Sequence, residues 1–156
     1  MSNIFVSKST DIESIISNVK LRAKSIPDDQ EHFIKFVAQN GREFKSDEMV
    51  KQGTVLHDDA KTLAEYAGAV PKRCFQNCRQ AMQMEDQIDA DVQYCEGYIQ
   101  YIENGQKILT RHAWILLDGY VAEITISPEI LPDEKRSYCG VQCSLAEAAE
   151  IADMHG

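Results

Sequence analysis

The chain has 156 residues, of which 44% are hydrophobic and 26% are charged, and its formal net charge is −9 at pH 7. This balance is typical of a single soluble globular domain. The negative charge disfavours contact with a phosphate backbone, so we expect no nucleic-acid partner, whereas a basic surface on a partner protein would suit the chain.

The N-terminus and the cysteines indicate a compartment. Residues 1–8 lack the long apolar core of a signal peptide, and no segment is long and apolar enough to predict a membrane span. The chain has five cysteines, an odd number. We therefore expect a cytoplasmic protein with reduced thiols that does not act at a membrane.

The first seventy residues are predicted to be mainly helical. An apolar stripe predicts a helix over 11–21, and the short apolar run 33–37 fits either a helix or a strand. Residues 47–55 are expected to be irregular. A further helix is predicted over 58–67, with Gly68 as its C-cap.

The second half predicts a helix followed by an antiparallel meander. Pro71 is expected to open a helix that runs to about Met84. Strands are predicted over 92–102, 107–117 and 120–126, because the turn pairs Asn104-Gly105 and Asp118-Gly119 join them. Pro128 and Pro132 are expected to bracket a loop.

A capping box at 144–147 predicts a last helix to about residue 154. The fold class is therefore α+β, with N-terminal helices, then a cysteine-bearing helix packed on a small antiparallel sheet, and a C-terminal helix. We expect one domain over 1–156, which divides into a helical part over 1–70, a core over 71–143 and a helix over 144–156.

Cys74 is the candidate nucleophile. It lies near a predicted helix start and directly follows Lys72 and Arg73. Helix N-termini and nearby cations favour a thiolate, and backbone N–H groups there are suited to bind an oxyanion. The structural alternative is a buried apolar stripe that includes Cys74 and Cys78.

His112 is the candidate base, because the unperturbed pKa of histidine lies near neutrality. Counting outward from Asp118-Gly119 makes His112 and Glu123 diagonal neighbours on one face of the hairpin, so Glu123 is expected to orient the imidazole. A buried structural histidine is the alternative. Glu96 interrupts an apolar strand. Three environments fit this position: a cleft, an ion pair with Arg111, or a solvated strand face.

The cysteine spacing leaves a rival chemistry open. Cys74 and Cys78 are separated by three residues, as are Cys139 and Cys143, and two such pairs suit a four-thiolate zinc site. The ribbon spacing typical of zinc has two intervening residues, so the thiol nucleophile is the preferred interpretation and we expect no metal.

Four segments carry a family resemblance: Arg73 to Cys78, Tyr94-Cys95-Glu96-Gly97-Tyr98, His112-Ala113-Trp114 and Val121 to Thr125. In this order they resemble the transglutaminase-like branch of the papain-like cysteine fold, in particular small uncharacterised phage and bacterial proteins. The resemblance covers about Pro71 to Gln142 and implies a core in which a cysteine-bearing helix packs on a sheet that bears histidine and then an acidic residue.

By position, the resemblance implies Cys74 as nucleophile, His112 as base and Glu123 as third member, with Glu96 and Trp114 in support. Two features depart from the family: glutamate followed by isoleucine replaces the usual aspartate, often followed by proline, and no glutamine stands at the papain-type position ahead of the cysteine. Asn77 is the remaining side-chain candidate for the oxyanion.

The predicted function is a thiol-dependent hydrolase or acyltransferase that acts on an amide, peptide or isopeptide bond of a protein or peptide-like substrate, without a metal or organic cofactor. The alternative is a catalytically inactive acidic binding protein on the same fold, such as a phage accessory protein that inhibits a host factor.

Overall fold

The structure is a computed structural model that describes residues 3–6, 33, 36–37, 40–126 and 135–147. Its strands are β1 (Asn3–Val6), β2 (Arg42–Phe44), β3 (Val92–Glu103), β4 (Gln106–Leu117), β5 (Tyr120–Ala122) and β6 (Arg136–Cys143). Its helices are α3 (Val55–Ala67) and α4 (Cys74–Gln83), with 3-10 turns η2 (Ser46–Glu48) and η3 (Glu85–Gln87). Within the described residues, no helix is long and apolar enough to cross a membrane.

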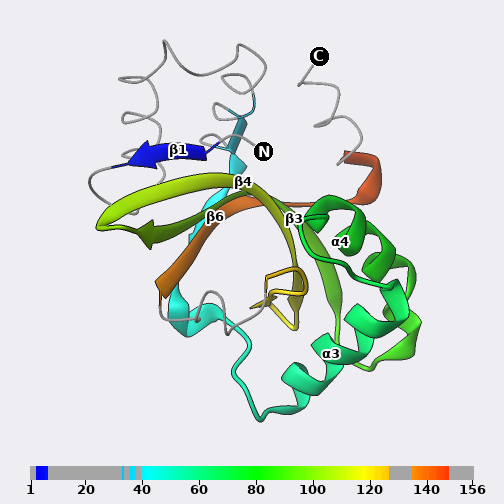
Figure 1. Ribbon diagram of the computed structural model, residues 1–156. Helices are drawn as coiled ribbons and strands as arrows, with labels where there is room; N and C mark the ends of the chain where they lie inside the picture. Colours follow the sequence, from blue (N-terminus) through cyan, green and yellow to red (C-terminus); the bar gives the residue numbers. More distant parts are fainter. Residues whose placement is uncertain (1–2, 7–32, 34–35, 38–39, 127–134, 148–156) are drawn as a thin grey trace.

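A curled antiparallel sheet organises the fold, and the α+β class is confirmed. Five strands follow one another in the order β1-β4-β3-β6-β2, and β5 pairs with β4 beside this path. Figure 1 shows α3 and α4 together on one side of the long strands β3 and β4. The strand β4 is therefore central, because it pairs with β1, β3 and β5.

Local signals explain both helices. Thr54 caps α3 by accepting a hydrogen bond from the His57 amide at 3.3 Å, and Gly68 ends this helix in the left-handed region at a φ of 65°. The predicted C-cap is thus confirmed. The prediction that Pro71 begins the next helix is wrong: Lys72 has a φ of 67°, which a right-handed helix does not accommodate, so α4 begins at Cys74.

The meander β3-β4-β5 is confirmed, including the predicted pairing of Leu117 with Tyr120. Asp118 and Gly119 both have positive φ angles, 50° and 89°, as a two-residue hairpin turn with both central residues left-handed requires. However, β5 ends at Ala122 rather than at Ile126, because the chain bends after it.

The prediction that residues 1–70 are helical is wrong for two segments. β1 pairs with β4, and β2 pairs with β6, so the N-terminal part contributes both ends of the sheet path. Strand β6 was not predicted at all.

Phe33, Phe36 and Val37 are helical. The predicted capping box is confirmed, because Ser144 and Glu147 form two reciprocal hydrogen bonds of 3.1 Å. The predicted helix 11–21, the loop between the two prolines and the end of the last helix lie outside the described residues.

The core lies on both faces of the sheet. One cluster packs the helices against the sheet and includes Leu63, Cys78, Tyr94 and Ile115. The other covers the opposite face and includes Phe44, Met49, Cys95, Ile99, Trp114 and Tyr138. His112 shares the strand face of Trp114, because residues two apart on a strand point to the same side.

Two glycines allow close contacts in this part of the sheet, since a Cβ atom on Gly97 would meet the backbone of Cys139 and Gly140. Gly97 pairs with Gly140, and His112 pairs with Gly97 on the other side. A Cβ atom on Gly140 would meet the Trp114 ring and the Glu96 carbonyl oxygen, which lies 2.5 Å from its ideal position. The indole thus occupies space that any side chain at position 140 would take.

We therefore expect Gly140→Ala to lower the free energy of unfolding by about 1–3 kcal/mol, as overpacking of a rigid core typically does. Urea denaturation measures the change. Gln142→Ala, at an exposed position of the same strand, is the control and should stay within about 0.5 kcal/mol of the parent. Equal stability of Gly140→Ala and the parent would show that the indole has room to move.

Candidate active site

His112 lies where β4 has no strand partner on one side. β1 pairs with residues up to Thr110, and β5 pairs with Ile115 to Leu117, so neither of these strands reaches His112. The side chains of Cys74 and Glu123 come together at His112 instead: the cysteine hydrogen-bonds to the imidazole, and the Glu123 Oε1 atom lies 2.7 Å from Nε2. The three predicted residues therefore form one connected group.

Glu123 is held by four hydrogen bonds. Its Oε1 atom accepts from the Tyr138 hydroxyl at 2.7 Å and contacts His112. Its Oε2 atom accepts from the backbone amides of Thr125 and Ile126 at 2.9 and 3.1 Å. The carboxylate thus reaches the imidazole from the bend that follows β5, with the backbone of that same bend fixing its direction.

Cys74 is the first residue of α4, so its sulfur lies at the N-terminus of this helix. Arg73 makes no side-chain cap there. A helix leaves the N–H groups of its first turn without intrahelical acceptors, and its dipole favours negative charge at this end. The predicted position of Cys74 at a helix start is confirmed, two residues after the left-handed Lys72.

Electrostatics make the histidine and the glutamate an ion pair. Burial alone would lower the pKa of His112, but the Glu123 charge and the hydrogen bonds with Cys74 and Glu123 outweigh it and raise the pKa to about 10. Burial alone would raise the pKa of Glu123, yet the His112 charge and the bonds from His112, Tyr138 and Thr125 lower it to about 2. The imidazole is therefore protonated and the carboxylate ionised at neutral pH.

Trp114 and Tyr138 enclose the imidazole. The Trp114 ring is stacked with that of His112 at a centroid distance of 6.4 Å and an interplanar angle of 19°. Tyr138 packs on Trp114 at 4.8 Å and lies 6.2 Å from the imidazole. The predicted supporting role of Trp114 thus has a geometric basis in ring packing.

Asn77 has a different role from the predicted one. Its amide nitrogen donates to the Val70 carbonyl at 2.7 Å and to the Thr125 hydroxyl at 3.0 Å, and its oxygen accepts from the Val70 amide at 3.1 Å. Because an amide nitrogen has two protons, none is left for an oxyanion. Asn77 instead ties α4 to the bend that carries Glu123.

Glu96 lies on the strand face opposite His112, since it pairs with the neighbouring Ala113. It is buried, and its Oε1 atom accepts from the Tyr94 hydroxyl at 2.7 Å and lies 3.5 Å from Arg79. Its ionic partner is thus a residue of α4, and the solvated-face alternative is wrong. Glu96 supports the packing of α4 rather than the imidazole.

Tyr138 is the site residue that sequence reasoning missed. It lies on β6, which was not predicted, and it reaches Glu123 only because β6 pairs with β3. The segment Tyr138-Cys139-Gly140-Val141 does not alternate between apolar and polar residues, so the sequence had no strong signal for this strand.

The cysteine pairs do not gather around a metal. Among the described residues, which include all five cysteines, no group of three or more His, Cys, Asp or Glu side chains has a metal-binding arrangement, and no cysteine forms a disulfide. Cys74, Cys78, Cys139 and Cys143 are individually buried.

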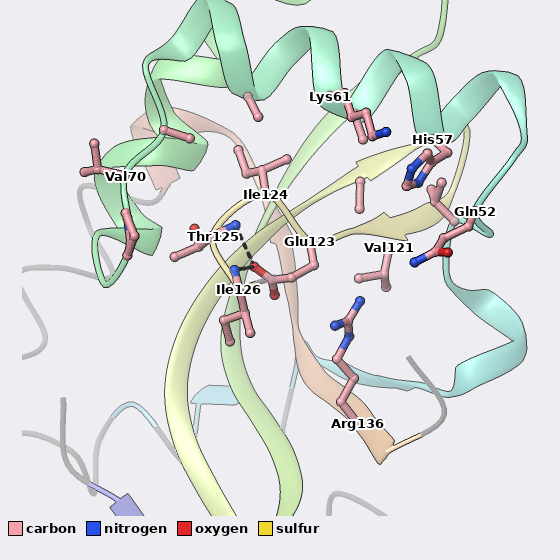
Figure 2. A pocket seen from close by; sticks show the side chains of 16 residues that line it. Gln52, His57, Lys61, Val70, Val121, Glu123, Ile124, Thr125, Ile126 and Arg136 are labelled. Atoms are coloured by element: carbon pink, nitrogen blue, oxygen red, sulfur yellow. Dashed lines mark hydrogen bonds between the residues drawn. The ribbon is translucent and has the colours of Figure 1, made fainter. Parts of the chain in front are cut away.

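A pocket of about 570 Å³ lies beside the site, between α3 and the bend after β5 (Figure 2). Glu123 and Thr125 line it, whereas Cys74 and His112 do not. Cys74 and His112 are each only 1% exposed. The pocket therefore meets the three-residue group from the glutamate side.

Comparisons of the chain with protein-family models, with curated proteins and with solved structures find no match. The family resemblance of the motifs therefore remains a prediction, and the functional argument depends on the geometry of the site.

We expect Glu123→Gln to keep the fold and to lower the pKa of His112 from about 10 to below its ordinary value of 6.5, because burial then acts without the opposing charge. Side-chain ¹⁵N NMR shifts followed from pH 5 to 11 measure this. Glu65→Gln, the same chemical change on an exposed face of α3, should leave the titration as it is. An unchanged pKa in Glu123→Gln would mean that Glu123 is not the partner of His112.

The same ion pair predicts how stability depends on pH. Because the pKa of folded His112 is about 10 and its ordinary value is 6.5, the pair stabilises fully below pH 6.5 and loses this contribution as the pH rises toward 10. Between pH 6.5 and 8.5 the free energy of unfolding should fall by up to about 1.4 kcal/mol per pH unit. Urea denaturation at several pH values measures the slope.

In Glu123→Gln this slope should vanish, since His112 is then neutral in both folded and unfolded chains above pH 6.5. Glu65→Gln should retain it. A slope that is equal in the parent and in Glu123→Gln would assign the pH dependence to other groups.

Proposed function

We propose that the protein is a thiol-dependent hydrolase or acyltransferase that acts on an amide, peptide or isopeptide bond. The observation that supports this is the continuous contact of Cys74, His112 and Glu123, in which the carboxylate is anchored by four hydrogen bonds. A thiol, an imidazole and a group that orients the imidazole are the parts that nucleophilic acyl transfer needs.

In the first half of the reaction, the Cys74 thiolate attacks the substrate carbonyl carbon, and a C–S bond forms. The protonated His112 gives its proton to the leaving nitrogen, and the C–N bond breaks. Amides in the first turn of α4 stabilise the transient oxyanion, since Asn77 is already engaged. The product of this half is a thioester on Cys74 and a free amine.

In the second half, water or an acceptor amine attacks the thioester, and His112 takes its proton. The C–S bond breaks and returns the Cys74 thiolate. Glu123 keeps one ring nitrogen of His112 engaged in both halves, so the imidazole cannot rotate away. Water as acceptor makes the protein a hydrolase, and an amine makes it an acyltransferase.

The second candidate is a catalytically inactive binding protein on the same fold. The burial of Cys74 and His112 favours it, because each is only 1% exposed and a substrate carbonyl must reach the sulfur. The net charge of −9 suits a basic partner surface. The two candidates differ in whether the Cys74 sulfur reacts.

We expect limited iodoacetamide labelling at neutral pH to modify Cys74 first. Exposure alone predicts another order, since Cys143 is 5% and Cys74 only 1% exposed. Burial is the main cause that raises the pKa of Cys78, Cys95 and Cys143 and so keeps these thiols protonated. Peptide mapping by mass spectrometry identifies the labelled residue.

Glu123→Gln should slow labelling of Cys74 about tenfold, because a neutral imidazole stabilises the thiolate less. Glu65→Gln is the matched control and should label at the parent rate. If Cys143 or Cys139 is labelled first while Cys74 stays protected, the binding-protein candidate replaces the enzyme.

A further inference from the structure

The loop between α3 and α4 is exposed, yet one buried side chain holds it. Residues 70–73 are all exposed, and Val70 has 44% of its surface open to solvent. The Val70 amide donates to the Asn77 Oδ1 atom at 3.1 Å, and the Val70 carbonyl oxygen accepts from the Asn77 Nδ2 atom at 2.7 Å. A single side chain of α4 therefore binds both backbone polar groups of a loop residue that packs little against the core.

The same side chain reaches the bend that carries Glu123. The Asn77 Nδ2 atom also donates to the Thr125 hydroxyl at 3.0 Å, and the Thr125 amide in turn binds Glu123 at 2.9 Å. Asn77 is only 1% exposed, so water competes little for its hydrogen bonds. We call the three hydrogen bonds of Asn77 with Val70 and Thr125 the clasp. It joins two segments that are far apart in the sequence.

The clasp lies next to the proposed nucleophile. Cys74 directly follows the loop, and Glu123 belongs to the bend, so the clasp joins the segments that position the thiol and the carboxylate. Val70 and Thr125 also line the pocket, and Figure 2 shows them at the end away from His57. A loop that moved away from the bend would therefore open a path from the pocket toward Cys74.

The proposed reaction needs such a movement. Cys74 and His112 are each only 1% exposed, whereas a substrate carbonyl carbon must come within about 3–3.5 Å of the attacking sulfur. The strands around His112 and the inner face of α4 belong to the core, but the loop 70–73 is exposed. Segments with few buried contacts open at the lowest free energy, so this loop is the segment that can move most easily.

The backbone of the loop favours the movement. Gly68, just before it, has a φ of 65°, and a Cβ atom there would have no heavy atom within 4 Å, so rotation at this glycine meets no obstacle. Lys72 has a φ of 67°, a conformation that is unfavourable for a residue with a Cβ atom. The closed loop is therefore strained at Lys72, and opening would relieve this strain.

We propose that the clasp is a gate: while it is closed, Cys74 stays covered, and its release moves the loop 70–73 away from the bend and admits the substrate to the sulfur. The purpose of this gate rests on the proposed thiol chemistry, but the opening itself does not require a reaction. The gate also reconciles a buried thiol with an enzyme, because the closed form protects the thiolate and the open form uses it.

The test changes one hydrogen bond of the clasp. Thr125→Val removes the hydroxyl, retains the branched shape, and leaves the Thr125 amide to bind Glu123. Loss of one hydrogen bond should raise the open population about fivefold. Because a thiol that reacts only in the open form is labelled in proportion to that population, iodoacetamide at neutral pH should label Cys74 about fivefold faster. Peptide mapping by mass spectrometry gives the rate.

The matched control is Thr62→Val on α3. The Thr62 hydroxyl donates to the Asp58 carbonyl oxygen of its own helix at 3.0 Å and joins no second segment, so this variant should label Cys74 at the parent rate. Cys78 and Cys95, which are 0% exposed, report unfolding of the whole domain. Their labelling should be the same in Thr125→Val and in the parent.

Two further measurements do not depend on the sulfur. Hydrogen exchange of the Val70 amide, followed by NMR, should be about fivefold faster in Thr125→Val, and faster still in Asn77→Ala, which removes all three bonds. The pKa of His112 should remain about 10 in Thr125→Val, because both amides that bind Glu123 are retained. Should Asn77→Ala fail to fold, Thr125→Val alone decides.

Two results would overturn the gate: equal labelling of Cys74 in Thr125→Val and the parent, or an acceleration that Cys78 and Cys95 share, which would indicate general unfolding. The proposed chemistry is tested separately by Glu123→Gln. Labelling of Cys74 that responds to Thr125→Val but not to Glu123→Gln would support the gate and refute the activated thiol. The reverse pattern would refute the gate alone.

Discussion

The burial of one carboxylate constrains the rest of this structure. An ionised carboxylate with only 1% of its side chain exposed is strongly unfavourable unless charge and hydrogen bonds replace the lost water. Glu123 obtains those replacements from three places: His112 on β4, Tyr138 on β6 and the amides of its own bend. These elements must therefore assemble together, because the loss of any one leaves a buried charge incompletely satisfied.

The same requirement links the sheet to the helices. Asn77 connects α4 to Thr125 in the bend that carries Glu123, and Cys74, one turn earlier in α4, reaches the imidazole. The glycine at position 140 lets the Trp114 ring, which is stacked with His112, lie close to β6. The contacts that stabilise the fold and those that orient the imidazole are thus largely the same, and this explains why the reactive groups of the proposed enzyme are also core residues.

Those parts of the site that depend on residues close together in the sequence could be predicted. The hairpin turn at Asp118-Gly119 set the register that brings His112 near Glu123, and a helix start near Cys74 followed from local residues. The predictions that were wrong concern side chains whose partners lie far away in the sequence. Asn77 was a candidate for the oxyanion, but contacts with Val70 and Thr125 use its amide, and Glu96 pairs with Arg79 on another element. The strand β6 lacks a strong alternating pattern, so Tyr138 had no local signal that connected it with Glu123.

The sequence by itself determined the α+β class, the meander and the approximate positions of the thiol, the imidazole and the carboxylate, because turn residues, helix caps and alternation act within a few residues. Only the tertiary structure decided that β1 and β2 extend the sheet, that Tyr138 completes the carboxylate site and that His57, Lys61 and Arg136 line one pocket. Those outcomes depend on strand pairing and burial between segments far apart in the chain. Local propensity carries no information about such pairings, since their energy arises only when the partners meet.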